Sequence, residues 1–338
     1  MTASHPAAGR DPDLYRAVQD IRAGYWMQMR QVLARTGYWA QWTSRTQVLG
    51  VAAAETNTVE LWLEEEPDSL AAQVMYARVA TERVLRAHRK QTATSPEQAR
   101  RLEKLADGAW QASGRAAALN PRDPVPWNCY IALTETDAIG RHPQHRVPPP
   151  QPEYLLPPGP WGLLREAHRR DPFNREAWHR MSQALQSRPG PAGRRAVATD
   201  FARWTASLAP ADSPLLLLPV YARVQEYRER RDSGEGVGNL LWSREDITRA
   251  VTRAFTGWFA NCDPATSSPL DLNHLAYALV RGGFPHWAAK VFEAIGVFAT
   301  RDPWQCHAQH PHQWRETFET DRDACLKSLP PHPEERRP

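Results

Sequence analysis

The residue types best suited to bind a metal ion lie near the C-terminus, in the segment CHAQHPHQW. These are Cys306, His307, His310 and His312, and Cys325 follows on the next predicted helix. Thiolate sulfur and imidazole nitrogen are good zinc ligands. In a typical zinc site, however, one closely spaced pair of ligands is followed by a second pair, and this segment has no second pair. We therefore expect a structural use for these side chains and keep a zinc site as the alternative.

A glycine pattern that can cradle phosphate occurs once, as Gly234, Gly236 and Gly238 in SGEGVGN. Phosphate binding needs this pattern between a buried strand and the start of a helix. Here it follows the charged helical segment YARVQEYRERRD, and Glu235 would repel an anion. We interpret it as a hinge.

Two sets of arginines have the helical spacing that would contact phosphates. They are Arg83, Arg86 and Arg89, and Arg223, Arg228, Arg230 and Arg231. Acidic residues at Glu82, Glu226 and Glu229 can pair with them, and the net charge of the whole chain is only +4. Solvated helix faces are therefore favoured over a nucleic-acid interface, which remains a third alternative.

No catalytic constellation can be identified. The sequence contains no G-x-S-x-G turn and no histidine pair with the spacing of a zinc protease, and its serines are scattered. We expect a protein without enzymatic activity and without a cofactor.

Composition predicts a protein whose cysteines are reduced and which has no membrane span. The 338 residues include four widely spaced cysteines, which are too few for disulfide bonds to stabilise a chain of this length. The first residues, MTASHPAAGRDPD, lack the apolar core of a signal peptide, and no stretch approaches the roughly 18 apolar residues of a membrane span. We therefore predict a cytoplasmic protein.

Apolar residues recur at three- and four-residue spacing, and period-two alternation of β-branched residues is absent, which predicts an all-α fold. The expected helices, which end at proline and glycine breaks, cover residues 12–35, 38–54, 56–65, 68–90, 96–118, 124–139, 160–170, 174–187, 191–208, 213–232, 243–261, 270–281, 285–300 and 311–328.

Two segments predict where one helical hairpin passes into the next. In LNPRDPVPW and RRDPFNREAW, a proline precedes by six residues a tryptophan, Trp127 or Trp178, that opens an apolar helical face. Proline ends a helix because it lacks an N–H donor, and the Asp or Asn after it can cap the following helix.

These hairpins resemble the tetratricopeptide repeat, a 34-residue pair of helices. The best copy has Leu272, Leu275, Ala276 and Leu279 in its first helix, Gly283 in its turn, and Ala288, Phe292 and Ile295 in its second helix. The order WLEEEPDSLAAQ, ALNPRDPVPW, REAHRRDPFNREAW is similar to a group of bacterial proteins with degenerate repeats of this kind. This resemblance implies an α-solenoid of about 13 to 15 antiparallel helices.

The expected organisation has one continuous repeat domain over residues 12–300 and a capping region over 301–330. Residues 1–11 and 331–338 are expected to be disordered. A proline-rich segment, 142–160, contains eight prolines and should form an extended polyproline loop inside one hairpin.

We hypothesise a non-catalytic scaffold that holds a peptide or helix of a partner protein on its concave face. Helical phase suggests that the residues facing this partner are Asn128, Glu135, His179, Gln183, Asn273, Tyr277 and Arg281. The alternatives are a helical metal-dependent enzyme or zinc-binding protein that uses the Cys306 region, and a nucleic-acid-binding protein.

Overall fold

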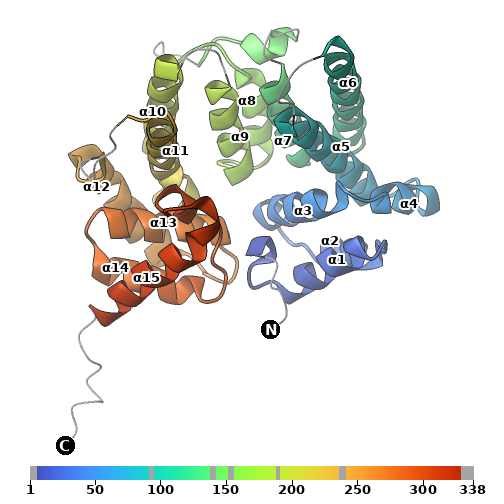
Figure 1. Cartoon of the computed structure of the whole chain (residues 1–338). Coiled ribbons are helices and arrows are strands. Elements are labelled where there is room, and N and C mark those ends of the chain that lie inside the picture. Colours follow the sequence, from blue (N-terminus) through green and yellow to red (C-terminus); the bar gives the residue numbers. More distant parts are fainter. Residues whose placement is uncertain are drawn as a thin grey trace, which may run out of the picture. The chain divides into compact units, whose positions relative to one another are not determined.

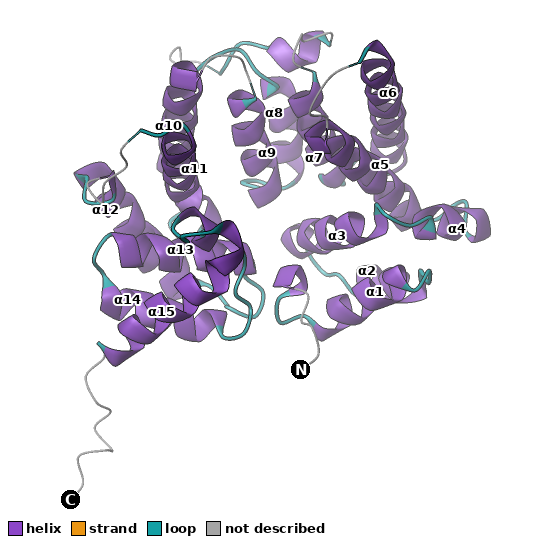
Figure 2. Ribbon diagram, viewed as in Figure 1, coloured by secondary structure: helices purple, strands orange, loops and turns teal. Residues whose placement is uncertain are grey.

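The structure is a computed structural model. It describes residues 6–90, 95–137, 142–150, 156–187, 191–235 and 241–328. In these ranges the chain is helical and has no β-strand, only an isolated antiparallel bridge between Val147 and Gly159 (Figure 2). The all-α class expected from the periodicity is confirmed.

The chain divides into two compact units. We call residues 11–201 the continuous unit, and residues 1–10 together with 202–338 the discontinuous unit. This division differs from the single domain expected over 12–300. The expectation of disorder over 1–11 is wrong for the described residues 6–11, since Pro6–Ala8 forms a 3-10 turn and Asp11 caps the first helix. Residues 1–5 and 331–338 lie outside the described part of the chain.

The continuous unit runs from blue to green in Figure 1. Its helices are α1 (Pro12–Arg22), α2 (Met27–Ala34), α3 (Trp39–Ala53), α4 (Thr58–Glu65), α5 (Leu70–Lys90), α6 (Pro96–Leu119), α7 (Val125–Leu133), the short η2 (Thr134–Thr136) and η3 (Pro143–Arg146), α8 (Trp161–Arg170), α9 (Arg175–Gln186) and the first part of α10 (Pro191–Leu208). Most helices next to each other in sequence pack together, such as α5 with α6 and α6 with α7, and α9 also packs on α3 and α7.

The discontinuous unit contains η1 (Pro6–Ala8) and the rest of α10. It continues with η4 (Pro214–Leu217), α11 (Leu218–Asp232), α12 (Glu245–Arg253), the π-helix η6 (Ala254–Phe259), α13 (Pro269–Arg281), α14 (Pro285–Ile295), η7 (Trp304–Cys306), η8 (Pro311–Gln313) and α15 (Trp314–Lys327). The packed pairs here include α13 with α14 and α14 with α15.

Several expected helices are shorter in the structure. The helix expected over 12–35 is two helices, α1 and α2, because Gly24 takes φ +90° in the turn between them. A side chain at that φ would be strained, so the turn suits glycine. The helix expected over 285–300 stops at Ile295, and the one expected over 124–139 continues past Leu133 only as the 3-10 turn η2.

Both proline-marked passages between helices are confirmed. Asp123 accepts a hydrogen bond from the backbone N–H of Val125 at the start of α7 (2.8 Å), and Asn174 accepts one from Ala177 at the start of α9 (3.0 Å). Asn174 therefore caps α9, as the sequence predicts. The N-cap position of α7 is Pro124, and Asp123 bonds to the start of this helix from one position earlier.

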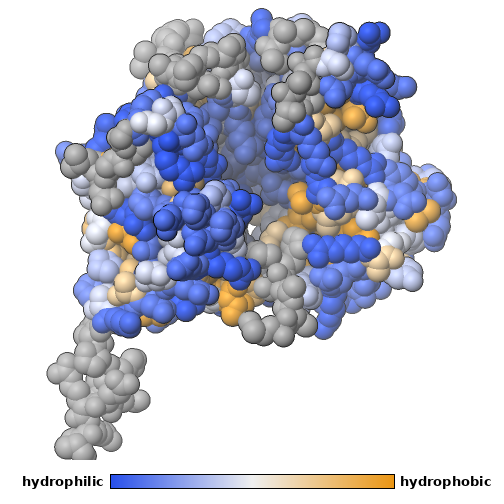
Figure 3. All heavy atoms as spheres, viewed as in Figure 1, coloured by the Kyte–Doolittle hydropathy of each residue, from blue (hydrophilic) through white to orange (hydrophobic). Residues whose placement is uncertain are grey.

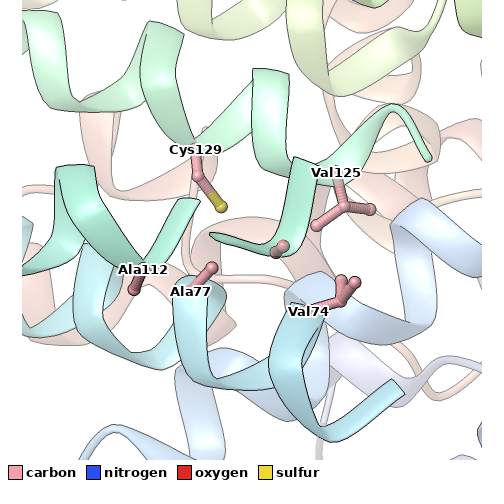
Figure 4. Packing of buried hydrophobic residues seen from close by; sticks show 6 residues of the cluster. Val74, Ala77, Ala112, Val125 and Cys129 are labelled. Carbon is pink, nitrogen blue, oxygen red and sulfur yellow. The ribbon is translucent and has the colours of Figure 1, made fainter. Parts of the chain in front are cut away.

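Small side chains allow α5, α6 and α7 to approach closely. One buried cluster contains Val74, Ala77, Ala112, Ala116, Val125 and Cys129, and Figure 4 shows how residues from the three helices face one another. Alanine at these contacts leaves little side-chain volume between the helix axes. The tryptophans fill the larger spaces, since Trp62, Trp242 and Trp304 are fully buried.

The proline-rich segment lies between η2 and α8, and α8 packs against α7. It is not extended throughout, because Pro143–Arg146 forms the 3-10 turn η3. Residues 151–155 of the segment lie outside the described residues.

Candidate functional site

The C-terminal cysteine and histidines do not form a metal centre. Cys306 is buried, and its sulfur accepts a hydrogen bond from Arg228 (3.5 Å). Burial raises the pKa of this thiol, which opposes formation of the thiolate that zinc requires. His310 and His312 are exposed, with their rings stacked 5.5 Å apart. Among the described residues, no three His, Cys, Asp or Glu side chains are placed to hold one ion.

His307 instead belongs to a cluster of aromatic side chains. The Tyr277 hydroxyl lies 2.8 Å from its Nδ1, and the Tyr227 hydroxyl lies 3.5 Å from its Nε2. The Tyr227 ring also stacks on the imidazole, with centroids 4.8 Å apart. A neutral imidazole has one donor and one acceptor nitrogen, so one tyrosine donates to it and the other accepts from it. Both ring nitrogens are therefore occupied within the fold.

The pKa of His307 gives a testable pH dependence. Burial, with the charges of Arg281 and Arg231, lowers it from its ordinary value of 6.5 to about 4. Between these values the unfolded chain binds a proton that the folded protein does not, so the free energy of unfolding decreases as the pH falls from 6.5 towards 4. We expect His307→Gln, which does not titrate, to show a flatter pH dependence of its urea midpoint over this interval. Parallel curves for wild type and variant would contradict this prediction.

The arginine sets bind within the molecule. Arg83 pairs with Glu60 and donates to the Ala54 carbonyl, and Arg86 pairs with Glu55 (2.6 Å). In the second set, Arg223 pairs with Glu226 (2.7 Å), Arg228 pairs with Asp302 (2.6 Å), Arg230 pairs with Glu226 (2.8 Å) and Arg231 donates to the Cys306 carbonyl (2.7 Å). The pairs with Glu226 lie within α11, whereas Arg83, Arg86, Arg228 and Arg231 join their helices to other elements.

The glycine pattern lies only partly in the described residues. Gly234 takes φ +73° directly after α11, whereas Gly236 and Gly238 lie outside the described residues.

Burial keeps two reactive side-chain types, the thiol of Cys129 and the hydroxyl of Tyr277, in their protonated forms. Cys129 is fully buried, and burial raises its pKa to about 11. Burial likewise raises the pKa of the Tyr277 hydroxyl well above its ordinary value. Groups with raised values stay protonated at neutral pH and are poor nucleophiles.

Three of the seven residues expected to face a partner are buried, so this expectation is wrong for them. Asn128 donates to Asn174 (3.1 Å), Asn273 accepts from the Trp304 indole (2.8 Å), and Tyr277 contacts His307. The expectation rested on helical phase, which places these three residues beside the apolar face of their helix. However, other parts of the chain pack on several sides of α7 and α13, and the three polar side chains bond to them.

A fourth expected residue, Arg281, is half-buried. It forms an ion pair with Asp321 of α15, and its guanidinium lies 5.5 Å from the centre of the Tyr277 ring. The ion pair between Arg281 and Asp321 therefore holds α15 against α13.

The remaining three expected residues are accessible and lie on adjacent elements. Gln183 is exposed on α9, His179 is half-buried one turn earlier, and Glu135 is half-buried on η2, which packs on α9. Arg180 of α9 lies 3.7 Å from the Glu135 carboxylate and joins the two elements. We call Glu135, His179 and Gln183 the α9 surface.

A buried ionic network, not anticipated from the sequence, lies next to the α9 surface. Arg78 of α5 donates to both oxygens of Glu176 on α9, at 2.5 and 2.7 Å, and the two side chains are 0% and 2% exposed. Arg180 donates to Glu82 of α5 (2.8 Å) and to Glu176 (3.4 Å). These two arginines and two glutamates therefore join α5 to α9. The partners Arg78 and Glu176 are 98 positions apart in the sequence, and so are Glu82 and Arg180.

Ion pairing outweighs burial for the pKa of Glu176, Arg78 and Arg180. Burial alone would raise the pKa of Glu176, but Arg78 and Arg180 hold it below its ordinary value. Burial alone would lower the pKa of Arg78, but Glu176 raises it above its ordinary value. Oppositely charged groups that face one another inside the protein are positioned to hold the helices together.

Polar side chains extend the network to two further helices. Asn128 of α7 donates to Glu176 (3.4 Å), and Arg78 donates to Thr46 of α3 (3.4 Å). Asn174, the cap of α9, donates to Thr43 of α3 (3.1 Å). The network therefore fixes α9 against α3, α5 and α7.

No helix among the described residues is both long and apolar enough to cross a membrane. Comparisons of the chain with protein-family models, curated proteins and solved structures find no match in any of the three.

Proposed function

We propose that this chain is a non-catalytic interaction protein, a tetratricopeptide-like helical scaffold that binds a peptide or helix of a partner protein at the α9 surface. The observation that carries the proposal is that two packed elements, α9 and η2, keep three polar side chains from full burial. Gln183 is exposed, and Glu135 and His179 are half-buried.

The ionic network supports the proposal because it makes the α9 surface rigid. Glu176 and Arg180 are one helical turn apart on α9, and both are tied to α5. A surface held by packed, hydrogen-bonded side chains loses little conformational freedom on binding, which favours affinity.

The packing of successive helices in the continuous unit is compatible with stacked hairpins. The contact of α3 with α9 departs from a strict solenoid, in which each repeat contacts only its neighbours. We therefore place the binding surface on α9 itself and not along a concave row of first helices.

The character of the surface indicates the kind of contact. On the face shown in Figure 3, hydrophobic residues occupy small areas separated by hydrophilic ones. At the α9 surface, the polar side chains of Glu135, His179 and Gln183 would hold a partner through hydrogen bonds.

Site-specific photo-crosslinking tests the proposal. We expect a benzophenone amino acid at position 183 to give a discrete crosslinked band with a partner protein when the full chain is expressed in its native host. The matched control is the same group at Gln111, an exposed glutamine on α6 of the same unit. A crosslink pattern at 183 that is the same as at 111, or absent, would refute the placement, and substitution of His179 with glutamate should reduce the band.

A further inference from the structure

A strongly basic segment spans the end of α5 and the start of α6. Residues 88–104 contain five basic and two acidic residues, a net charge of +3, whereas the whole chain carries only +4. The two helices pack together, and Leu102 and Ala106 of α6 pack against a cluster that contains Val84 of α5. The last turn of α5 therefore lies beside the first turns of α6.

The three cations on α6 are not neutralised within the fold. Arg100, Arg101 and Lys104 are exposed, and none of them forms an ion pair in the part of the chain that the structure describes. Arg100 makes one hydrogen bond, from its Nε to a backbone carbonyl of the same helix (3.2 Å). Arg83 and Arg86 of α5 are different, because each pairs with a glutamate. The α6 cations are therefore available to an anion from outside the molecule.

These side chains line one hollow of the surface. Arg100, Arg101 and Lys104, together with Glu97, surround an open depression of about 420 Å³. Residues three and four positions apart are neighbours on a helix, so Lys104 lies next to both arginines. Guanidinium and ammonium groups form charge-assisted hydrogen bonds to carboxylates. With three cations and one carboxylate, the depression favours an anionic ligand.

An apolar side chain borders the cations. Leu105 is 47% exposed, directly follows Lys104 and lies one helical turn after Arg101. Phosphate groups would leave this leucine in water, whereas an apolar side chain of a peptide would bury it. We call Arg100, Arg101, Lys104 and Leu105 the α6 tip. Its composition favours a peptide that carries both carboxylates and an apolar residue over a nucleic acid.

We propose that the α6 tip binds an acidic peptide segment of a partner protein. The carboxylates of this segment pair with the three cations, and an apolar side chain between them covers Leu105. A short segment is sufficient, because Arg100 and Lys104 are separated by only about 6 Å along the helix axis. The α6 tip and the α9 surface lie on different elements, so either proposal can fail without the other.

Fluorescence anisotropy of a labelled synthetic peptide, titrated with the full chain, tests the proposal. The probe is a glutamate-rich peptide that contains leucine, and the comparison peptide has serine in place of leucine. We expect saturable binding of the probe, weaker binding of the comparison peptide, and a loss of affinity as added salt screens the charges. Leu105→Ser should remove the difference between the two peptides.

Charge reversal tests the cations directly. The double substitution Arg101→Glu with Lys104→Glu should weaken binding of the leucine-containing probe at least tenfold, about 1.4 kcal/mol. The matched control is Arg115→Glu with Arg122→Glu, which changes the net charge of the chain equally. Both control residues are exposed, and Arg115 lies roughly 16 Å beyond Lys104 along α6.

The control variant should bind the probe as wild type does, and unaltered thermal unfolding would show that both variants fold. Absence of saturable binding, or equal weakening by the two double variants, would overturn the proposal. Tighter binding of a single-stranded oligonucleotide of the same charge as the probe would also overturn it, because the α6 tip would then be a nucleic-acid site.

Discussion

Replacing Glu176 with glutamine is expected to lower the free energy of unfolding by about 3–5 kcal/mol, because the change leaves a buried guanidinium without its counter-charge. Arg78 is 0% exposed and makes its two short hydrogen bonds to this carboxylate. Denaturant unfolding followed by circular dichroism measures the effect.

Two companion variants show whether the buried charge is the cause. Arg16→Ala removes an exposed pair with Asp13 in the same unit, whose side chains are 69% and 41% exposed, and should change stability by less than about 1 kcal/mol. Replacing Arg78 with methionine and Glu176 with leucine together should cost less than Glu176→Gln alone, because no unpaired charge stays between these positions. A mild effect of Glu176→Gln would mean that the network contributes little to stability.

A large effect is also expected from Gly257→Ala in the π-helix η6. A Cβ atom at this position would overlap the carbonyl oxygen of Ala211 and lie 3.1 Å from a methyl group of Leu216. Because the obstacle is backbone, a rotamer change does not relieve it, and we expect a loss of about 3 kcal/mol in the free energy of unfolding.

The control for Gly257 is the same substitution at Gly108 on α6. Nothing lies within 4 Å of a Cβ atom there. Alanine in an open helical position should therefore stabilise the protein by up to about 1 kcal/mol. If thermal unfolding shows both variants moving in the same direction, the steric explanation for Gly257 is wrong.

Local signals in the sequence were sufficient for most of the helices and for the cap of α9. Asn174 follows a proline and caps this helix, because capping requires only groups within a few residues. The break between α1 and α2 was missed, although its signal, Gly24, was also local.

The buried network could not be predicted from one sequence. Helical phase assigns residues to faces, but it does not say which faces a later helix will cover. Asn128 was expected to be accessible for this reason, although Glu176, 48 positions later, accepts its hydrogen bond. The polar type of a residue does not distinguish a solvated side chain from one that has a buried partner.

Gln183 was expected to be accessible and is exposed, because few helices follow it in its unit. Gln183 lies near the end of α9, and no later helix of the continuous unit other than the start of α10 follows it. Tyr277 and Asn273, in contrast, precede α14, η7 and α15, which supply the groups that bury them.

The order of the two units along the chain has a consequence for synthesis. The described residues before Asp11 belong to the discontinuous unit, where Arg10 donates to the carbonyl of Ala294 (2.9 Å) and lies 6.0 Å from the centre of the Phe298 ring. On the ribosome these residues emerge before residues 11–201, but their contacts exist only after Ala294 and Phe298 have been synthesised. Residues 11–201 leave the exit tunnel as one uninterrupted block and have all their internal partners while translation continues. Folding should therefore begin with residues 11–201, and residues 6–10 should reach their place in the structure later.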